Sequence, residues 1–375
     1  MTVSIVQSGI NLKASISDSL KLIDFKLTKK NIFMKPNLVV PARPDSGIIT
    51  NPDVVVSLAE VLREEYGAGE IIVGDGPQMG CSIEECFEVG RYREVAEKHD
   101  LKLIDLYNAK RVGVSWKYGL LEIPEIIQNC CYINIPKIKT HSQTTVTLSL
   151  KNQKGLLSVL DKKNFHKLGL HEPIAELYRV VKPDLVVVDG LIGLEGDGPI
   201  FGGKRRRLDL IVAGTNALEV DKVCCGIMGI SPDEVKHLKI ASRFSEERVQ
   251  LEIRGLQIDR LNIRPFKRAN EKLRKIGKVY YWRNASACTM CSESLNQAIN
   301  EVKGNSFLMM RYGTHILYHI LFKRLDFLIG KDAEIPQNHG EICCIGNCVA
   351  PLAKRYNLKL ARGCPPKPRD ILNKL

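Results

Sequence analysis

The stretch Cys131-Tyr-Ile-Asn-Ile-Pro-Lys-Ile-Lys-Thr-His141 indicates the fold of the longer, N-terminal part of the chain. Its first five residues form a short apolar segment of the kind that occupies a buried strand. Cationic and polar residues follow at once, so we expect them at the carboxyl end of that strand. Open α/β sheets bind their ligands at this edge. The stretch therefore predicts a buried strand that leads into a binding site.

Apolar segments of similar length recur along the first 262 residues, and helical patterns separate them. The predicted strands lie at residues 3–6, 31–35, 71–73, 103–106, 131–135, 185–188 and 208–213. One helix is well defined, because Asn51 suits a helix cap, Pro52 suits the first helical position, and Gly67 or Gly69 suits the end. This alternation predicts an α/β domain over residues 1–262, with a largely parallel or mixed sheet flanked by helices.

Composition and charge narrow the class of protein. The chain has 375 residues, 44% hydrophobic and 26% charged, which is typical of a soluble globular protein with a large core. No signal peptide and no apolar run long enough to span a bilayer is recognisable, so we expect a cytoplasmic protein. The formal net charge is +13, with basic runs at residues 204–207 and 264–283. A solvated surface, an anionic substrate or an acidic redox partner protein would each explain this charge, and without a recognisable motif nucleic acid is the least favoured explanation.

Six of the twelve cysteines fall between residues 288 and 364, in the last quarter of the chain. They belong to a predicted smaller module, residues 263–375, which begins with the basic linker. Cys288 and Cys291 form a CxxC motif, Cys348 follows a Gly-Asn pair, and Cys364 precedes two prolines. Four converging thiolates suit a [4Fe–4S] cluster or a tetrahedral zinc ion, and the Cys-Pro dipeptide favours the cluster. We predict these four cysteines as the ligands, against the simpler explanation that they are ordinary reduced thiols.

Several motifs together resemble the domain-of-unknown-function family 362, which is common in anaerobic bacteria and archaea. The matching stretches are Met34-Lys-Pro-Asn-Leu38, Gly47-Ile-Ile-Thr-Asn-Pro52, Gly67-Ala-Gly-Glu-Ile-Ile-Val-Gly-Asp75, Pro136-Lys-Ile-Lys-Thr-His141, Leu148-Ser-Leu-Lys-Asn-Gln-Lys-Gly-Leu156, Val188-Asp-Gly190 and Gly196-Asp-Gly-Pro199. They cover about residues 35–221. The resemblance implies an α/β domain, frequently joined to a ferredoxin-like four-iron, four-sulfur module, and it implies no particular reaction.

The cysteine spacing departs from that family's usual compact CxxCxxCxxxCP motif. The Gly-Cys-Pro-Pro ending looks like that of the cluster-binding subunit of respiratory complex I and related hydrogenases, over only a few residues. The departure leaves the third ligand open, because Cys343 or Cys344 could replace Cys348. We favour Cys348, since residues 341–345 are predicted to form a buried strand and Cys348 follows in the loop.

Polar residues at the predicted strand ends form the candidate substrate site. Lysine, histidine and asparagine side chains bind phosphate or carboxylate groups and supply acid–base groups. The predicted catalytic residues are Lys137, Lys151 and His141, with His141 as a proton donor. The predicted substrate-binding residues are Lys35, Asn37, Asp75, Asn152, Asp189, Glu195 and Asp197. Exposed lysines with a satisfied histidine, and a plain mobile loop around Glu195, are the alternatives.

We expect an iron–sulfur redox protein, an oxidoreductase that passes electrons from the cluster to a small anionic substrate. One alternative is an electron carrier or assembly factor that docks to a partner through residues 264–283. Another is a binding protein stabilised by zinc. Between the linker and Cys343, residues 315–329 are predicted to form one amphipathic or buried helix.

Overall fold

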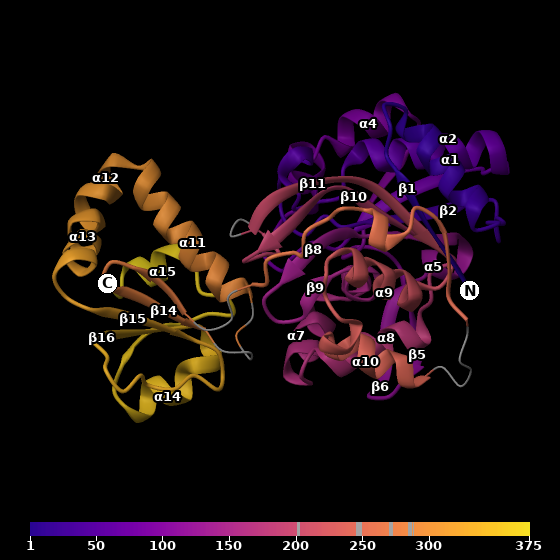
Figure 1. Cartoon of the computed structure of the whole chain (residues 1–375). Coiled ribbons are helices and arrows are strands. Elements are labelled where there is room, and N and C mark those ends of the chain that lie inside the picture. The colour runs from indigo at the N-terminus through magenta and orange to yellow at the C-terminus, as the bar shows by residue number, and fades with distance from the viewer. Residues whose placement is uncertain (201–202, 245–249, 270–272, 284–286, 288) are drawn as a thin grey trace. The chain divides into compact units, whose positions relative to one another are not determined.

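The computed structural model describes residues 1–200, 203–244, 250–269, 273–283, 287 and 289–375. It forms two compact units, Met1–Ala269 (unit 1) and Asn270–Leu375 (unit 2), shown in Figure 1. Each unit has its own mixed β-sheet with helices against it, as the predicted α/β class requires. Within the described part of the chain, no helix is long and apolar enough to cross a membrane.

Unit 1 is built on a ten-stranded mixed sheet. Its main path runs β12 (Glu252–Gly255), β1 (Thr2–Gln7), β11 (Gly203–Gly214), β10 (Leu185–Gly196), β7 (Cys131–Ile135), β2 (Ile32–Pro36), β3 (Ile71–Asp75) and β4 (Lys102–Asp105). The strands from β10 to β4 are parallel, whereas β11 is antiparallel to both β10 and β1. Two further strands lie off this path. β8 (Lys137–His141) pairs with β10 in parallel, and β9 (Thr145–Thr147) pairs with β8 in the antiparallel direction. The parallel strands therefore end at a common edge.

Central strands of unit 1 are buried on both faces, which explains their nearly continuous apolar sequence. Phe33 of β2 and Tyr132 of β7 stack at 5.9 Å between ring centroids on one face of the sheet. Met34 and Ile133 point into the core on the other face. Figure 1 shows helices α1, α2 and α4 on that second side and α8, α9 and α10 on the first. The sheet thus separates two hydrophobic layers.

The helices of unit 1 are α1 (Leu12–Leu22), α2 (Pro52–Tyr66), α3 (Ile83–Val89), α4 (Tyr92–Lys98), α5 (Ile126–Asn129), α6 (Ser149–Asn152), α7 (Val159–Lys167), α8 (His171–Val180), α9 (Ala217–Ile227) and α10 (Lys236–Ala241). Side-chain caps mark the start of five of these helices, α1, α2, α3, α7 and α9. The Asn51 side chain accepts a hydrogen bond from Asp53 N at 2.9 Å, and Gly67 ends α2 with φ of 68°. A short hairpin, β5 (Arg111–Trp116) and β6 (Gly119–Pro124), lies outside the main sheet.

Unit 2 contains a five-stranded sheet in the order β13 (Leu273–Ile276), β14 (Val279–Arg283), β15 (Leu325–Ile329), β16 (Glu341–Ile345) and β17 (Lys359–Ala361). The first two strands form an antiparallel hairpin, and the remaining pairs are parallel. The helical segments are α11 (Thr289–Gly304), α12 (Ser306–Leu308), a π-helical turn (Met309–Gly313), α13 (Thr314–Leu321), α14 (Ala350–Arg355) and α15 (Pro368–Leu372). Because β14, β15, β16 and β17 are parallel, the carboxyl ends of β14, β16 and β17 lie at the same edge of this sheet.

The prediction of one helix over residues 315–329 is wrong. The helix ends at Leu321, and Leu325–Ile329 is the buried strand β15 at the centre of the sheet of unit 2. Phe327 packs on one side of that sheet and Leu328 on the other. A strand that is buried on both faces has a continuous apolar sequence, and periodicity alone does not distinguish it from a buried helix.

Candidate functional site

A buried ion pair joins the carboxyl ends of β2 and β3. Lys35 Nζ lies 2.7 Å from Asp75 Oδ1, and the two side chains are 0% and 3% exposed. The Asp75 carboxylate also accepts hydrogen bonds from Leu38 N and Gly76 N, each at 2.8 Å. Burial lowers the pKa of Lys35, and the Asp75 charge opposes that effect. Two predicted substrate-binding residues therefore contact each other.

A second buried ion pair joins β8 to β10. Lys137 Nζ lies 2.7 Å from Asp189 Oδ2, and both side chains are fully buried. Asp189 also accepts from Asn51 N at 2.7 Å and from Leu191 N at 3.0 Å. The Asp189 carboxylate thereby joins β8 and the residue before α2 to the middle of β10. Lys137, predicted as catalytic, holds this framework together in the structure.

Side-chain amides connect the same strand ends. Asn37 Nδ2 donates to Asn152 Oδ1 at 2.8 Å, and Asn152 Nδ2 donates to Asn134 Oδ1 at 2.7 Å. Lys139 Nζ donates to Asn37 Oδ1 at 2.7 Å and to Ile48 O at 2.6 Å. The structure thus brings Asn37 and Asn152 together and adds Lys139 and Asn134, which the sequence analysis missed. The sequence did contain a signal for Lys139. Lys137 and Lys139 are two residues apart, so in an extended chain their side chains lie on the same face.

Gly155 explains why the chain turns so close to the first ion pair. A Cβ at Gly155 would lie 1.9 Å from Asp75 Oδ1 and 2.5 Å from Lys35 Nζ. The 3₁₀ turn Gln153–Leu156, which follows α6, therefore packs its backbone directly against the pair. No other residue fits at this position without moving the pair, so the glycine is required by close approach.

Cationic side chains gather beside this framework. Lys162 Nζ donates to Gly76 O, Pro77 O and Tyr107 Oη at 2.7–2.9 Å, and burial lowers its pKa to about 7. Burial and then Lys137 lower the pKa of Lys139 to about 7 as well. Both ammonium groups have neutral oxygen acceptors. These two lysines therefore add positive charge beside the two neutral ion pairs, although burial reduces their charge near pH 7.

Lys151 extends the cluster toward α7. Its Nζ lies 3.4 Å from Thr147 Oγ1, and burial, Lys154 and Lys139 lower its pKa well below the ordinary value. Lys154 Nζ lies 3.5 Å from His166 Nε2. Burial, Lys154 and Lys151 lower the pKa of His166 to about 3. Because the cations disfavour one another's charge, a bound anion would relieve the repulsion.

His141 is 4% exposed and held in one orientation by backbone donors. Its Nδ1 accepts from Gln143 N at 3.0 Å and from Thr144 N at 3.3 Å. This arrangement favours the neutral ring with its proton on Nε2. The loop that carries Asp197 packs next to it on β8, since Thr140 Oγ1 donates to Gly196 O at 2.8 Å. His141 can therefore donate a hydrogen bond through Nε2.

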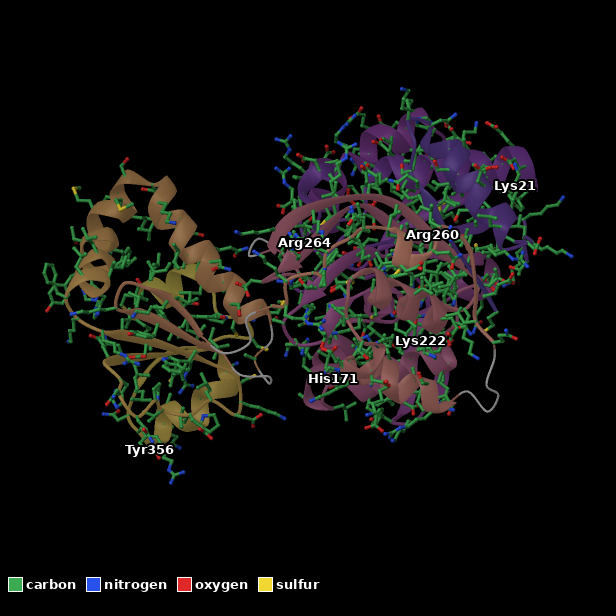
Figure 2. The ribbon with its side chains drawn as sticks, viewed as in Figure 1. Lys21, His171, Lys222, Arg260, Arg264 and Tyr356 are labelled. Atoms are coloured by element: carbon green, nitrogen blue, oxygen red, sulfur yellow. The ribbon has the colours of Figure 1, made fainter. Side chains whose placement is uncertain are left out.

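Glu195 lies in an ion-pair cluster with arginines. It contacts Arg264 at 2.5 Å and Arg206 at 3.2 Å, and it accepts from Lys267 N at 3.2 Å. Burial alone would raise the pKa of Glu195, but Arg264 and its other donors lower it. Arg264, labelled in Figure 2, thus ties the end of unit 1 to β10. These contacts occupy both oxygens of Glu195.

The cysteine-bearing loops of unit 2 converge at one edge of its sheet. Gly346 has φ of 93°, and a Cβ there would lie 2.6 Å from Cys291 Sγ. Asn347 N donates to Gly363 O at 2.9 Å, and Gly363 N donates to Asn347 Oδ1 at 3.0 Å. The residues just before Cys348 and Cys364 are therefore bonded to each other beside Cys291. Cys288 lies outside the described residues.

Cys343 and Cys344 belong to the strand β16, as predicted, and their side chains enter opposite core layers. Burial raises the pKa of Cys343 to about 12 and that of Cys344 to about 11. Metals bind the thiolate, which these environments disfavour. Within the ranges that the structure describes, no group of three or more histidine, cysteine, aspartate or glutamate side chains is arranged to hold a metal, and Cys288 is not part of that set.

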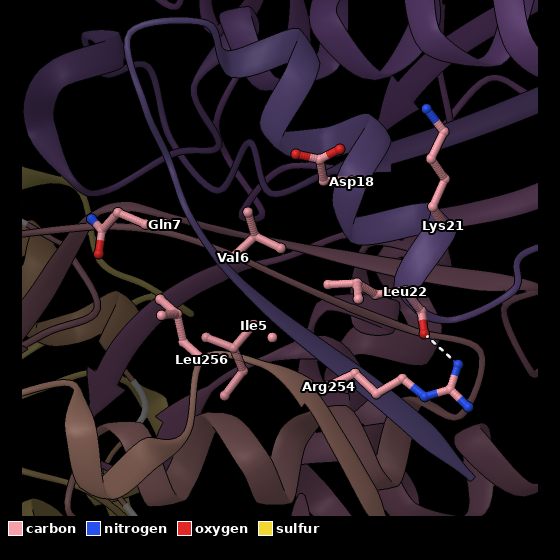
Figure 3. Close-up of a pocket in the computed structure, with 9 residues that line it drawn as sticks. Ile5, Val6, Gln7, Asp18, Lys21, Leu22, Arg254 and Leu256 are labelled. Carbon is pink, nitrogen blue, oxygen red and sulfur yellow. Dashed lines mark hydrogen bonds between the residues drawn. The ribbon is translucent and has the colours of Figure 1, made fainter.

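A separate hollow of about 630 Å³ lies on unit 1 between α1 and β12 (Figure 3). Its lining includes Val6, Asp18, Leu22 and Leu256, and Arg254 donates to Leu22 O there at 2.9 Å. None of the predicted site residues lines it. The polar cluster at the strand ends and this hollow are therefore distinct features.

Comparison with known proteins assigns the larger part of unit 1 to a protein family. A family model described as "Domain of unknown function (DUF362)" matches residues 32–226, slightly more than half of the chain. A thylakoid-associated protein from Synechocystis sp. is 27% identical over 222 residues, which cover 57% of this chain and 67% of that protein. A crystal structure of a Thermotoga maritima protein matches with a TM-score of 0.38 and 12% identity, over 63% of this chain and 60% of that one. The last likeness is too weak to support an argument.

Proposed function

The chain belongs to the DUF362 family, and on that premise we propose that it is an iron–sulfur redox protein that reduces a small anionic substrate. Unit 2 would hold a [4Fe–4S] cluster through Cys288, Cys291, Cys348 and Cys364. Unit 1 would hold the substrate at the carboxyl ends of its strands. The observation that carries the proposal is the convergence of three cysteine-bearing segments at one edge of the sheet of unit 2.

The geometry around Gly346 fits a cluster site. The missing side chain at Gly346 leaves space that the Cys291 sulfur approaches, and the Asn347–Gly363 hydrogen bonds fix the loops that carry Cys348 and Cys364. Cys348 and Cys364 are exposed, so both can turn toward a common centre. Thiolates are the ligands of iron–sulfur clusters, and a bound cluster supplies single electrons to a reduction. Burial of Cys343 and Cys344 supports Cys348 as the third ligand.

The cation cluster of unit 1 supports an anionic substrate. Lys151 and Lys154 would contact its phosphate or carboxylate group, and the Lys139 ammonium would add positive charge from β8. The two buried ion pairs hold these strand ends in fixed positions. His141 would orient the substrate by donating from Nε2, because its Nδ1 is occupied by backbone N–H groups. An external electron donor must reduce the cluster between turnovers.

Zinc is the alternative occupant of the same thiolates, and it would make unit 2 a structural module. The docking alternative finds less support, because the basic run is partly neutralised within unit 1. Arg264 pairs with Glu195 at 2.5 Å, and Arg268 pairs with Glu234 at 2.9 Å. An acidic partner would have to compete with these carboxylates.

Iron, acid-labile sulfide and zinc per chain, measured on protein purified without oxygen, test the cluster. We expect about four irons and four sulfides with a broad visible absorption that bleaches on reduction. Serine at Cys291, Cys348 or Cys364 should lower the iron content, whereas the matched control Cys344→Ala should keep it. Zinc without sulfide in the wild-type chain would replace the redox proposal with the structural one.

A further inference from the structure

The helical segment of residues 306–321 in unit 2 is apolar on both sides. Leu308, Tyr312 and Ile316 recur every four residues and pack against the core of unit 2. Other large apolar side chains of the segment and its C-terminal cap face outward. They are Phe307 (64% exposed), Met309 (43%), Met310 (75%), Leu317 (53%), Tyr318 (49%), Leu321 (52%) and Phe322 (68%). Helices that face water normally carry polar residues on this side.

The outward residues form a stripe, which we name the apolar stripe and define as Phe307, Met309, Met310, Leu317, Tyr318, Leu321 and Phe322. A spacing of three residues places Phe307 beside Met310 at the start of the π-helical turn, and a spacing of four places Leu317 beside Leu321 in α13. Scattered apolar residues on a surface need no explanation, but a contiguous exposed patch marks an interaction site. The stripe is therefore a candidate docking surface.

The charged side chains within the segment of the apolar stripe are cationic, although Lys323 Nζ lies 3.4 Å from the Glu341 carboxylate of β16. No aspartate or glutamate occurs between Glu301 and Asp326, while Lys303, Arg311 and Lys323 are exposed beside the stripe. Lys278 also reaches the end of the helix, where its Nζ donates to Phe322 O at 3.1 Å. A second copy of the chain on this face would bring two sets of cations together. An anionic surface is the complementary one.

We propose that the apolar stripe binds the surface of a membrane that contains anionic lipids. An apolar face bordered by lysine and arginine is the pattern of helices that lie in the plane of a membrane, with the apolar side chains below the headgroups. The segment would bind in this orientation, since no helix in the described ranges is long enough to span a bilayer. This inference is independent of the proposed cluster and substrate.

Co-sedimentation of the full chain with lipid vesicles tests the proposal. We expect binding to mixed phosphatidylcholine–phosphatidylglycerol vesicles, weaker binding to phosphatidylcholine alone, and loss of binding as salt rises. Leu317→Ser with Phe322→Ser should weaken binding about tenfold or more, because two side chains no longer enter the apolar layer. The control Leu120→Ser changes a residue of unit 1 that is 71% exposed and should bind like the wild type.

Circular dichroism would show that the double variant keeps its fold, which is expected because both side chains are exposed. Lys303→Glu with Lys323→Glu should reduce binding to the mixed vesicles and leave binding to phosphatidylcholine unchanged. Equal vesicle binding by the wild type and the double serine variant would overturn the proposal. So would a dimer in sedimentation velocity that the double serine variant abolishes, because the stripe would then be covered by a second copy.

Discussion

Replacing Asp75 with asparagine should destabilise unit 1 by about 3–5 kcal/mol, because it leaves the Lys35 ammonium buried without a counter-charge. At the observed 2.7 Å, the attraction between the two charges is about 6 kcal/mol at an effective dielectric constant near 20. Part of it is lost in any case to desolvation of the two groups. Lys35 has one other acceptor among the hydrogen bonds of the described residues, Pro36 O at 3.2 Å. Deprotonation of Lys35 would limit the loss in the variant.

The backbone contacts of Asp75 add to the effect. Its carboxylate accepts from both Leu38 N and Gly76 N, and the asparagine NH₂ group would face one of these donors. Lys35→Met should cost less than Asp75→Asn, because the carboxylate would keep its two N–H donors. The double variant should be more stable than Asp75→Asn alone, since it no longer contains a buried unpaired charge.

Tryptophan fluorescence during urea unfolding measures this loss in unit 1. The assay uses a Trp282→Phe background, so that Trp116 of β5, stacked on Phe165 at 5.3 Å, reports on unit 1 alone. Glu94→Gln is the control, because it breaks the exposed Arg91–Glu94 pair and should leave the midpoint nearly unchanged. If Asp75→Asn shifted the midpoint no more than this control, the ion pair would not be what holds the ends of β2 and β3.

Three further predictions concern the same unit. Gly155→Ala should destabilise unit 1 in the same urea assay, because its Cβ would lie 1.9 Å from Asp75 Oδ1, whereas Gly9→Ala meets no atom within 4 Å and should not. His171, labelled in Figure 2, has its pKa lowered to about 4 by burial and Lys236, so this residue should lower the unfolding free energy by about 1.4 kcal/mol per pH unit between pH 6.5 and 4. His171→Gln should reduce the measured slope by about that amount. Phosphate should raise the melting temperature of the wild type more than that of Lys151→Met, and equal shifts would remove Lys151 from the anion site.

The unfolding free energy falls as the pH falls, because the unfolded chain binds the His171 proton more readily than the folded chain does. The folded chain disfavours the charged ring, so below pH 6.5 the unfolded chain binds the proton first and gains stability relative to the fold. The stability contribution of neutral His171 is therefore complete above about pH 6.5 and lost as the pH falls toward 4. His237, whose ring stacks on His171 at 6.0 Å between centroids, has its pKa lowered by burial and adds to the same trend.

The fold class could be predicted because local signals and burial agree in unit 1. The segment 131–135 is apolar and forms the buried strand β7, and the Asn51-Pro52 pair begins α2 as expected. The strand β11 was predicted only from residue 208, because its first residues are charged. That part of β11 pairs with the extension of β10, for example Arg205 with Leu194, and pairing of this kind depends on tertiary structure.

The site could be predicted as a set of residue types and not as a set of contacts. Lys35 and Asp75 were both expected to bind substrate, but nothing in their sequence positions indicates that they bond to each other at 2.7 Å. Parallel strands that are distant in the chain create that contact. Lys139 was missed for a related reason. The sequence placed residues 136–141 after the strand 131–135, whereas Lys137–His141 forms the strand β8, and the acceptors of Lys139, Asn37 and Ile48, are distant in the chain.

The acceptors of each buried lysine distinguish the lysines that hold the site together from those that could bind a ligand. Lys35 and Lys137 each have one buried carboxylate, and Lys139 and Lys162 each donate to at least two neutral oxygens. Lys151 differs from these four, because its hydrogen bond to Thr147 is long, at 3.4 Å, while burial and then Lys154 and Lys139 lower its pKa well below the ordinary value. An anion that enters the site would therefore gain most from Lys151. Removing Lys151 should weaken anion binding while the ion pairs keep unit 1 folded.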